Sequence, residues 1–268
     1  LSQKKIATLL THLLHFETMK IAALNQDIIW KDPKTNFALI DKQLTEVQAD
    51  LFLLPEMFTT GFCMEPEKIA DQHEETLLWM KSFAAQKKVA IAGSVAVAEE
   101  GHYYNRFYFV KPDGNHQYYD KGHLFSYSGE DRVYTSGKKR MIVSYNGWKI
   151  LLQVCYDLRF PVFSRNNADY DAILYVANWP NSRIDAWQTL LKARAIENQC
   201  YVFGVNRIGS DDNHLQYPES TYCFFADGSV VSTTKGVIVS AEWNAEKLLN
   251  FRTKFSFLND RDCFEITD

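Results

Sequence analysis

The sequence predicts an α/β fold, a layered sandwich in which helices cover mixed β-sheets. Short apolar runs typical of buried strands alternate along the chain with segments whose apolar residues recur at helical spacing. Turn sequences at 112–115 and at Asn146-Gly147 join neighbouring runs as hairpins, so antiparallel pairs are expected beside parallel ones. No stretch rich in Gly, Pro or Ser divides the 268 residues, and we therefore expect a single domain.

The first half of the chain is expected to alternate strands with two helices. Its segments are a strand at 19–26, a helix at 36–48, a strand at 49–56, a helix at 74–87, strands at 89–97 and 103–110, and a strand that starts near His116. The helix at 36–48 has apolar residues at helical spacing after the start signal Asp32-Pro33. The run at 49–56 is apolar and broken by Pro55, which indicates a buried strand that delivers Glu56 to its carboxyl end.

The second half repeats this rhythm. Its segments are strands at 141–145 and 149–154, a helix near 162–167, a strand at 172–176, a helix at 185–198, and strands at 201–206, 221–225 and 230–233. The strand at 149–154 leads directly into Cys155. In layered α/β folds functional residues gather at strand ends, so the site is expected there.

Residues 1–18 are interpreted as a leader or upstream extension, because the pattern changes sharply at Met19, and residues 19–268 as the single domain. The apolar stretch around 9–16 is short and contains Thr11, His12 and His15. It fits neither a secretory signal nor a transmembrane span, so we expect no membrane partner.

Composition excludes several classes of function. A formal net charge of -4 with interspersed signs provides no basic stripe for a nucleic acid. The five cysteines lie far apart and form no Cys-x-x-Cys pair, so no structural metal is expected. Unpaired thiols are typical of a cytoplasmic protein, and for four of them we expect core packing: Cys63, Cys200, Cys223 and Cys263.

Cys155 has a different setting from the other cysteines. It follows an apolar strand and precedes a helical turn, where a thiol can be exposed and backbone N–H groups can bind an oxyanion. A buried cysteine at a strand end fits this position equally well. None of the seven histidines lies in a Cys–His arrangement, so a thiol nucleophile here would need another base.

Glu56 and Lys121 are candidates for that chemistry. Each lies beyond a strand, and a carboxylate can take a thiol proton while an ammonium favours the thiolate and stabilises an oxyanion. A lone Glu or Lys is more often a solvated surface residue, so neither is decisive by itself.

The sequence around these residues resembles the three signature blocks of the nitrilase superfamily, in the family's order. The blocks are LPEMFTTGF at 54–62, YDKGHLF at 119–125 and QVCYDLRFP at 153–161. The resemblance implies a four-layer α-β-β-α sandwich with two mixed β-sheets, and a homodimer or larger assembly. It also implies Cys155 as nucleophile, Glu56 as general base and Lys121 as oxyanion stabiliser, with no metal or organic cofactor.

The family also has a second glutamate after the lysine block, and Glu130 matches it. Its neighbour Asp131 could be confused with it, and an exposed loop carboxylate is the alternative interpretation.

Residues 175–180 (YVANWP), Trp187 and residues 193–199 (ARAIENQ) resemble the omega-amidase branch of the superfamily. This implies hydrolysis of the terminal amide of 2-oxoglutaramate or 2-oxosuccinamate through a cysteine acyl-enzyme. Tyr156, Arg159 and Trp179 are expected to bind this substrate. An equally good interpretation of Arg159 is that it forms a structural ion pair within the protein.

A nitrilase, an N-carbamoylase, an aliphatic amidase and an inactive scaffold are the alternatives. The segment at 217–221 departs from the glycine-containing version expected of the family, which affects only local loop detail.

Overall fold

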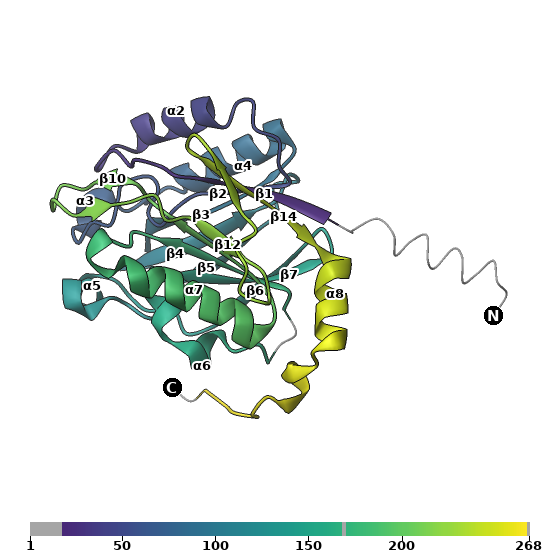
Figure 1. Cartoon of the computed structure of the whole chain (residues 1–268). Helices are drawn as coiled ribbons and strands as arrows, with labels where there is room; N and C mark the ends of the chain where they lie inside the picture. Colours follow the sequence, from purple (N-terminus) through teal and green to yellow (C-terminus); the bar gives the residue numbers. More distant parts are fainter. Residues whose placement is uncertain (1–17, 168–169, 267–268) are drawn as a thin grey trace.

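Two β-sheets pack face to face between helices in the computed structural model, which describes residues 18–167 and 170–266 (Figure 1). The larger sheet contains, in spatial order, β13 (Thr233–Lys235), β14 (Ile238–Asn244), β1 (Thr18–Leu24), β2 (Leu51–Leu53), β3 (Ala90–Glu99), β4 (His102–Val110) and β5 (His116–Asp120). The second sheet contains β12 (Tyr222–Phe224), β9 (Tyr201–Asn206), β8 (Ala172–Ala177), β7 (Trp148–Val154) and β6 (Met141–Tyr145). A two-stranded ribbon, β10 (Gly209–Ser210) with β11 (Gln216–Tyr217), stands apart.

Both large sheets are mixed. Strands β1, β2 and β3 run parallel to one another, as do β7, β8 and β9, while the outer pairings of both sheets are antiparallel. The helices are α2 (Pro33–Gln43), α3 (Pro66–Ile69), α4 (Glu75–Lys87), α5 (Glu130–Val133), α6 (Pro161–Ser164), α7 (Ile184–Asn198) and α8 (Ala245–Lys254). Short 3-10 turns are η1 (Ser126–Ser128), η2 (Cys155–Arg159), η3 (Asn181–Arg183) and η4 (Phe257–Asp260).

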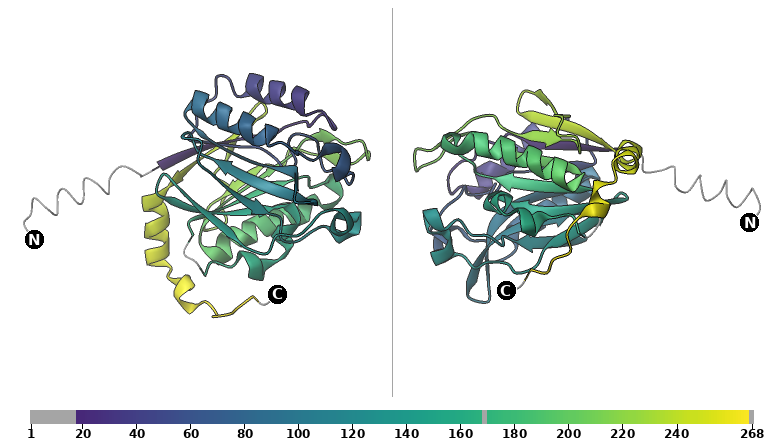
Figure 2. Two further views of the ribbon diagram at one scale, coloured as in Figure 1. Left: turned by 180° about the vertical axis from the view of Figure 1, so that it is seen from behind. Right: turned by 60° about the horizontal axis from the view of Figure 1, so that its bottom comes forward.

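Alternate residues of a strand point to opposite faces of its sheet, and this alternation distributes apolar side chains among the three largest of four hydrophobic cores. In β1, Met19 and Ile21 face the second sheet, whereas Ala22 and Leu24 face α2 and α4. In β7, Leu151 points instead into the core beneath α7. Figure 2 shows the same layering from two further sides. The predicted α-β-β-α sandwich with two mixed sheets is confirmed.

Several element boundaries differ from the prediction. Helix α2 begins at Pro33, because the Asp32 side chain caps the helix by accepting the backbone N–H of Thr35 at 3.1 Å. Strand β1 begins at Thr18, one residue before the expected domain start. Residues 1–17 of the expected leader lie outside the described residues.

The expected strand at 230–233 is wrong. Val230 makes only an isolated bridge to Phe224, and the strand starts at Thr233 as β13. The position of this strand depends on tertiary contacts, because β13 pairs with β14 and β14 pairs with β1. The C-terminal part of the chain thereby joins the larger sheet. No helix in the described ranges is long and apolar enough to cross a membrane.

Candidate active site

The predicted site residues come together where strands from both sheets end. Glu56 lies three residues after β2, Cys155 directly after β7, and Asn178 directly after β8. Lys121 follows β5. The carboxyl ends of parallel strands are the usual location of sites in layered α/β folds, as expected from the sequence.

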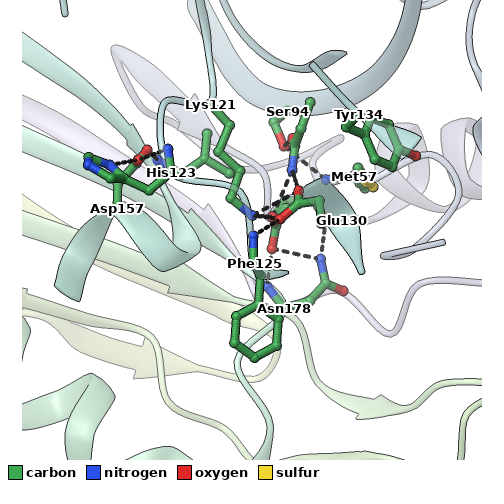
Figure 3. Close-up of polar contacts among 12 residues, drawn as sticks. Met57, Ser94, Lys121, His123, Phe125, Glu130, Tyr134, Asp157 and Asn178 are labelled. Carbon is green, nitrogen blue, oxygen red and sulfur yellow. Dashed lines mark hydrogen bonds and ion pairs between the residues drawn. The ribbon is translucent and has the colours of Figure 1, made fainter. Parts of the chain in front are cut away.

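Lys121 lies between two carboxylates (Figure 3). Its Nζ is 2.9 Å from Oε1 of Glu56, and 3.0 and 2.9 Å from Oε1 and Oε2 of Glu130. All three side chains are fully buried. Glu130 is therefore not an exposed loop carboxylate, and the structure places it against Lys121 as the resemblance implied.

Two asparagines that the sequence did not single out hold the carboxylates. Asn105, in β4, donates from Nδ2 to Oε1 of Glu56 at 2.8 Å and to Oε1 of Glu130 at 3.3 Å. Asn178 donates its backbone N–H to Oε2 of Glu56 at 2.8 Å. Asn178 belongs to the segment that resembled the omega-amidase branch, whereas Asn105 stands in an ordinary strand with no motif to mark it.

Cys155 occupies a strained turn. Its φ is +45°, a left-handed conformation that residues with a side chain rarely adopt, and Met57, next to Glu56, has φ +46°. Such strain, about 1–3 kcal/mol per residue, persists only where the surroundings impose it, and it is concentrated at functional sites. Here it marks the two turns that carry the thiol and the carboxylate.

Asp157 connects the cysteine turn with the lysine loop. Its buried carboxylate accepts the N–H of Val154, the hydroxyl of Tyr119 and the N–H of His123, each at 2.9 Å. Nδ1 of His123 lies 2.8 Å from the same carboxylate (Figure 3). Because Lys121 lies between Tyr119 and His123, this carboxylate sets the position of the ammonium relative to the thiol.

Three ionisable groups surround the Cys155 thiol: the carboxyl groups of Glu56 and Glu130, and the ammonium group of Lys121. With both carboxyl groups ionised, two negative charges lie beside one positive charge. Burial would lower the pKa of Lys121, but the charges of Glu130 and Glu56 raise it above its ordinary value. Burial raises the pKa of Glu130, and the nearby Glu56 charge adds to this, although Lys121 opposes it. The ammonium therefore stays charged, and a thiolate would add a third negative charge to the site.

These surroundings raise the pKa of the Cys155 thiol. Burial, then the charge of Glu56, raise its pKa well above the usual range, and Lys121 offsets only part of this. A hydrogen bond with Glu56 also raises the pKa. The Lys121 charge thus favours the thiolate, as expected from the sequence, but burial and the carboxylates act in the opposite direction and outweigh it in the unliganded site.

This electrostatic setting predicts slow alkylation of Cys155 by iodoacetamide at about pH 7 and a rate that keeps rising above pH 9, because only the thiolate reacts. Peptide mass spectrometry would follow each cysteine separately, with Cys263 as the internal reference. The core packing expected of Cys263 is wrong, because its segment near the C-terminus leaves this cysteine exposed. A Cys155 rate that levels off below about pH 8 would show a thiolate already present.

Beside Cys155 lies a cavity of about 210 Å³. The three expected substrate-binding residues, Tyr156, Arg159 and Trp179, line it, and so does Arg183, which the sequence analysis missed. The Arg159 guanidinium stacks on the Trp179 ring at 5.1 Å and has no ion-pair partner within the described residues. The alternative of a structural ion pair is therefore not what the structure shows.

Metal-ligating side chains do not cluster in the described part of the chain: no group of three or more His, Cys, Asp or Glu there could hold an ion.

Both the sequence and the fold of this chain are similar to those of known proteins. Residues 20–250 match the carbon-nitrogen hydrolase family. An omega-amidase YafV from Yersinia enterocolitica is 44% identical over 251 residues, covering 92% of this chain and 98% of that protein. A 2-oxoglutaramate amidase from Bacillus subtilis is 35% identical, covering 72% of this chain and 78% of that protein.

A crystal structure of a CN-hydrolase superfamily protein from Xanthomonas campestris, with an arsenic adduct in its active site, superposes with a TM-score of 0.91. It is 38% identical, and the alignment covers 93% of this chain and 99% of that one. The chain therefore belongs to the carbon-nitrogen hydrolase family of the nitrilase superfamily, and it is an amidohydrolase that acts on carbon–nitrogen bonds other than peptide bonds.

Proposed function

We propose that the chain is an omega-amidase that removes the terminal amide of small 2-oxo dicarboxylate monoamides, such as 2-oxoglutaramate and 2-oxosuccinamate. The observation that carries this proposal is the Arg159 guanidinium, which lines the cavity beside Cys155 without a carboxylate partner in the described residues. A guanidinium in that position suits a substrate carboxylate. Relatives named omega-amidase and 2-oxoglutaramate amidase support the same substrate class.

The proposed reaction begins at the thiol. Glu56 takes the proton of Cys155 as sulfur attacks the amide carbonyl, so that charge moves to the carbonyl oxygen without a free thiolate having to accumulate. The Lys121 ammonium and the backbone N–H of Tyr156 stabilise this oxyanion.

Collapse of the oxyanion breaks the carbon–nitrogen bond. Glu56 returns its proton to the departing nitrogen, ammonia leaves, and a thioester remains on Cys155. Water then gives a proton to Glu56 and attacks the thioester, which releases the carboxylic acid and restores the thiol. Asn105 and Asn178 hold the Glu56 carboxylate in place through both half-reactions.

Substrate choice is tested by measuring ammonia release from a panel: 2-oxoglutaramate, 2-oxosuccinamate, glutaramate, glutamine, an N-carbamoyl amino acid and a simple nitrile. We expect the highest kcat/KM for the 2-oxo amides, because they present a carboxylate to Arg159 at one end and the scissile amide at the other. Glutamine is expected to be poor, because its α-ammonium would lie near that cation. Preference for the nitrile or the carbamoyl compound would overturn the assignment in favour of a nitrilase or an N-carbamoylase.

The homo-oligomer and the cytoplasmic location implied by the sequence stay predictions.

A further inference from the structure

The cavity beside Cys155 contains a second guanidinium, that of Arg183 at the end of η3. This group stacks on the Phe125 ring at 5.2 Å, as Arg159 stacks on Trp179. Within residues 18–167 and 170–266 neither arginine has an ion-pair partner. Two positive charges thus face a small cavity, and no carboxylate of the described residues forms an ion pair with either of them.

Trp179 links the two arginines. Its ring is almost fully buried and lies under the Arg159 guanidinium, while its Nε1–H donates to the carbonyl oxygen of Arg183 at 2.7 Å. The backbone N–H of Trp179 is in turn held by Oδ1 of Asn206 at 2.7 Å. The buried Trp179 side chain therefore holds the backbone carbonyl of Arg183 by a hydrogen bond and provides the ring face on which the Arg159 guanidinium stacks.

Arg183 is also connected to the reacting groups. The backbone N–H of Phe125, on which Arg183 stacks, donates to Oε2 of Glu130 at 2.6 Å, and Glu130 binds Lys121. Phe125 also contacts Tyr156, the residue after the nucleophile, with ring centroids 5.0 Å apart. The second guanidinium is thereby held at a set place relative to Cys155.

The acidic side chain in the cavity lining is already engaged. Asp211 accepts the N–H groups of Asn213 and Leu215, each at 3.0 Å, and the hydroxyl of Tyr217 at 2.8 Å. These hydrogen bonds hold the loop between β10 and β11, and they occupy most of the acceptor positions of the Asp211 carboxylate. Asp211 thus has a structural role in the cavity wall, and Arg159 and Arg183 make the cavity positively charged.

We propose that Arg183 is a specificity-determining residue that forms, with Arg159, a two-arginine subsite for a carboxylate with an adjacent oxo group. This inference rests on the proposed function. A 2-oxo carboxylate presents three acceptor oxygens, and a single guanidinium fork satisfies two of them. A second guanidinium takes the third, so the subsite distinguishes a 2-oxo acid from a plain carboxylate, which has two oxygens to offer.

The test compares Arg183→Met with the unaltered enzyme on three amides: 2-oxoglutaramate, glutaramate and the neutral pentanamide. Methionine keeps an unbranched chain against Phe125 but removes the charge. We expect kcat/KM to fall roughly 10- to 100-fold for 2-oxoglutaramate, mainly through KM, less for glutaramate, and not for pentanamide. Arg159→Met should lower kcat/KM for both anionic amides. Arg132→Met, at an exposed arginine outside the cavity lining, is the matched control and should change none of the three values.

Arg183→Lys provides a second variant, which keeps the charge and loses the planar fork. It should retain activity on glutaramate better than on 2-oxoglutaramate. An equal loss on all three amides, or an unchanged preference for 2-oxoglutaramate in Arg183→Met, would overturn the two-arginine subsite. That result is distinct from failure of the proposed function, in which the unaltered enzyme itself would prefer a nitrile, a carbamoyl compound or the neutral amide.

Discussion

Replacement of Cys155 by alanine is expected to lower amide hydrolysis by at least about 10³-fold, because it removes the thiol on which the proposed acyl-enzyme forms. The fold should survive. Alanine and cysteine carry the same Cβ, so the left-handed backbone at +45° is no more strained in the variant than in the parent enzyme. Ammonia release gives the activity, and circular dichroism with thermal unfolding gives the integrity of the fold.

The matched control for this substitution is Cys263→Ala, at an exposed cysteine near the C-terminus. It should leave kcat and the unfolding temperature unchanged. The other three cysteines are poorer controls, because Cys63, Cys200 and Cys223 are buried and truncation would also cost packing. Turnover retained by folded Cys155→Ala would refute the nucleophile assignment.

Replacement of Lys121 by methionine should affect both activity and stability. Loss of the ammonium removes the proposed oxyanion stabiliser, which is worth roughly 10²- to 10³-fold in kcat. It also leaves Glu56 and Glu130 buried without their cation, at a cost of about 3–5 kcal/mol in the free energy of unfolding. Activity assays and denaturant unfolding measure the two effects separately.

The pH dependence of the stability effect follows from the raised pKa of Lys121. A lysine whose pKa is higher in the folded state contributes stability that is fully present below its ordinary pKa and is lost as the pH rises through the folded value. The destabilisation of Lys121→Met should therefore be fully visible at neutral pH. Lys138→Met, at an exposed lysine, is the control and should change little.

A double variant separates the two roles of the lysine. Adding Glu130→Gln to Lys121→Met removes one of the uncompensated carboxylates and should recover part of the lost stability without recovering kcat. Recovery of both together would mean that Lys121 acts only by holding the fold. Unchanged kcat in a folded Lys121→Met enzyme would contradict its role at the oxyanion.

The elements that could be predicted from the sequence are those whose signals are local. The short apolar runs of β1 and β7 and the Asp32-Pro33 helix start depend on neighbouring residues alone. The strand expected at 230–233 failed because β13 owes its place to β14 and, through it, to β1, at the other end of the chain. No short-range pattern contains that information.

The sequence alone predicted Glu56, Lys121, Cys155 and Glu130 as site residues, because each lies in or near a block that resembles a known family. Only the tertiary structure brought Asn105, Asp157 and Arg183 into the site, since hydrogen bonds and stacking between residues 25 to 58 positions apart leave no periodic trace in the sequence. The tertiary structure also determines the direction in which the pKa of Cys155 shifts. Burial and the summed charge of its neighbours, which depend on distance in space and not along the chain, raise its pKa.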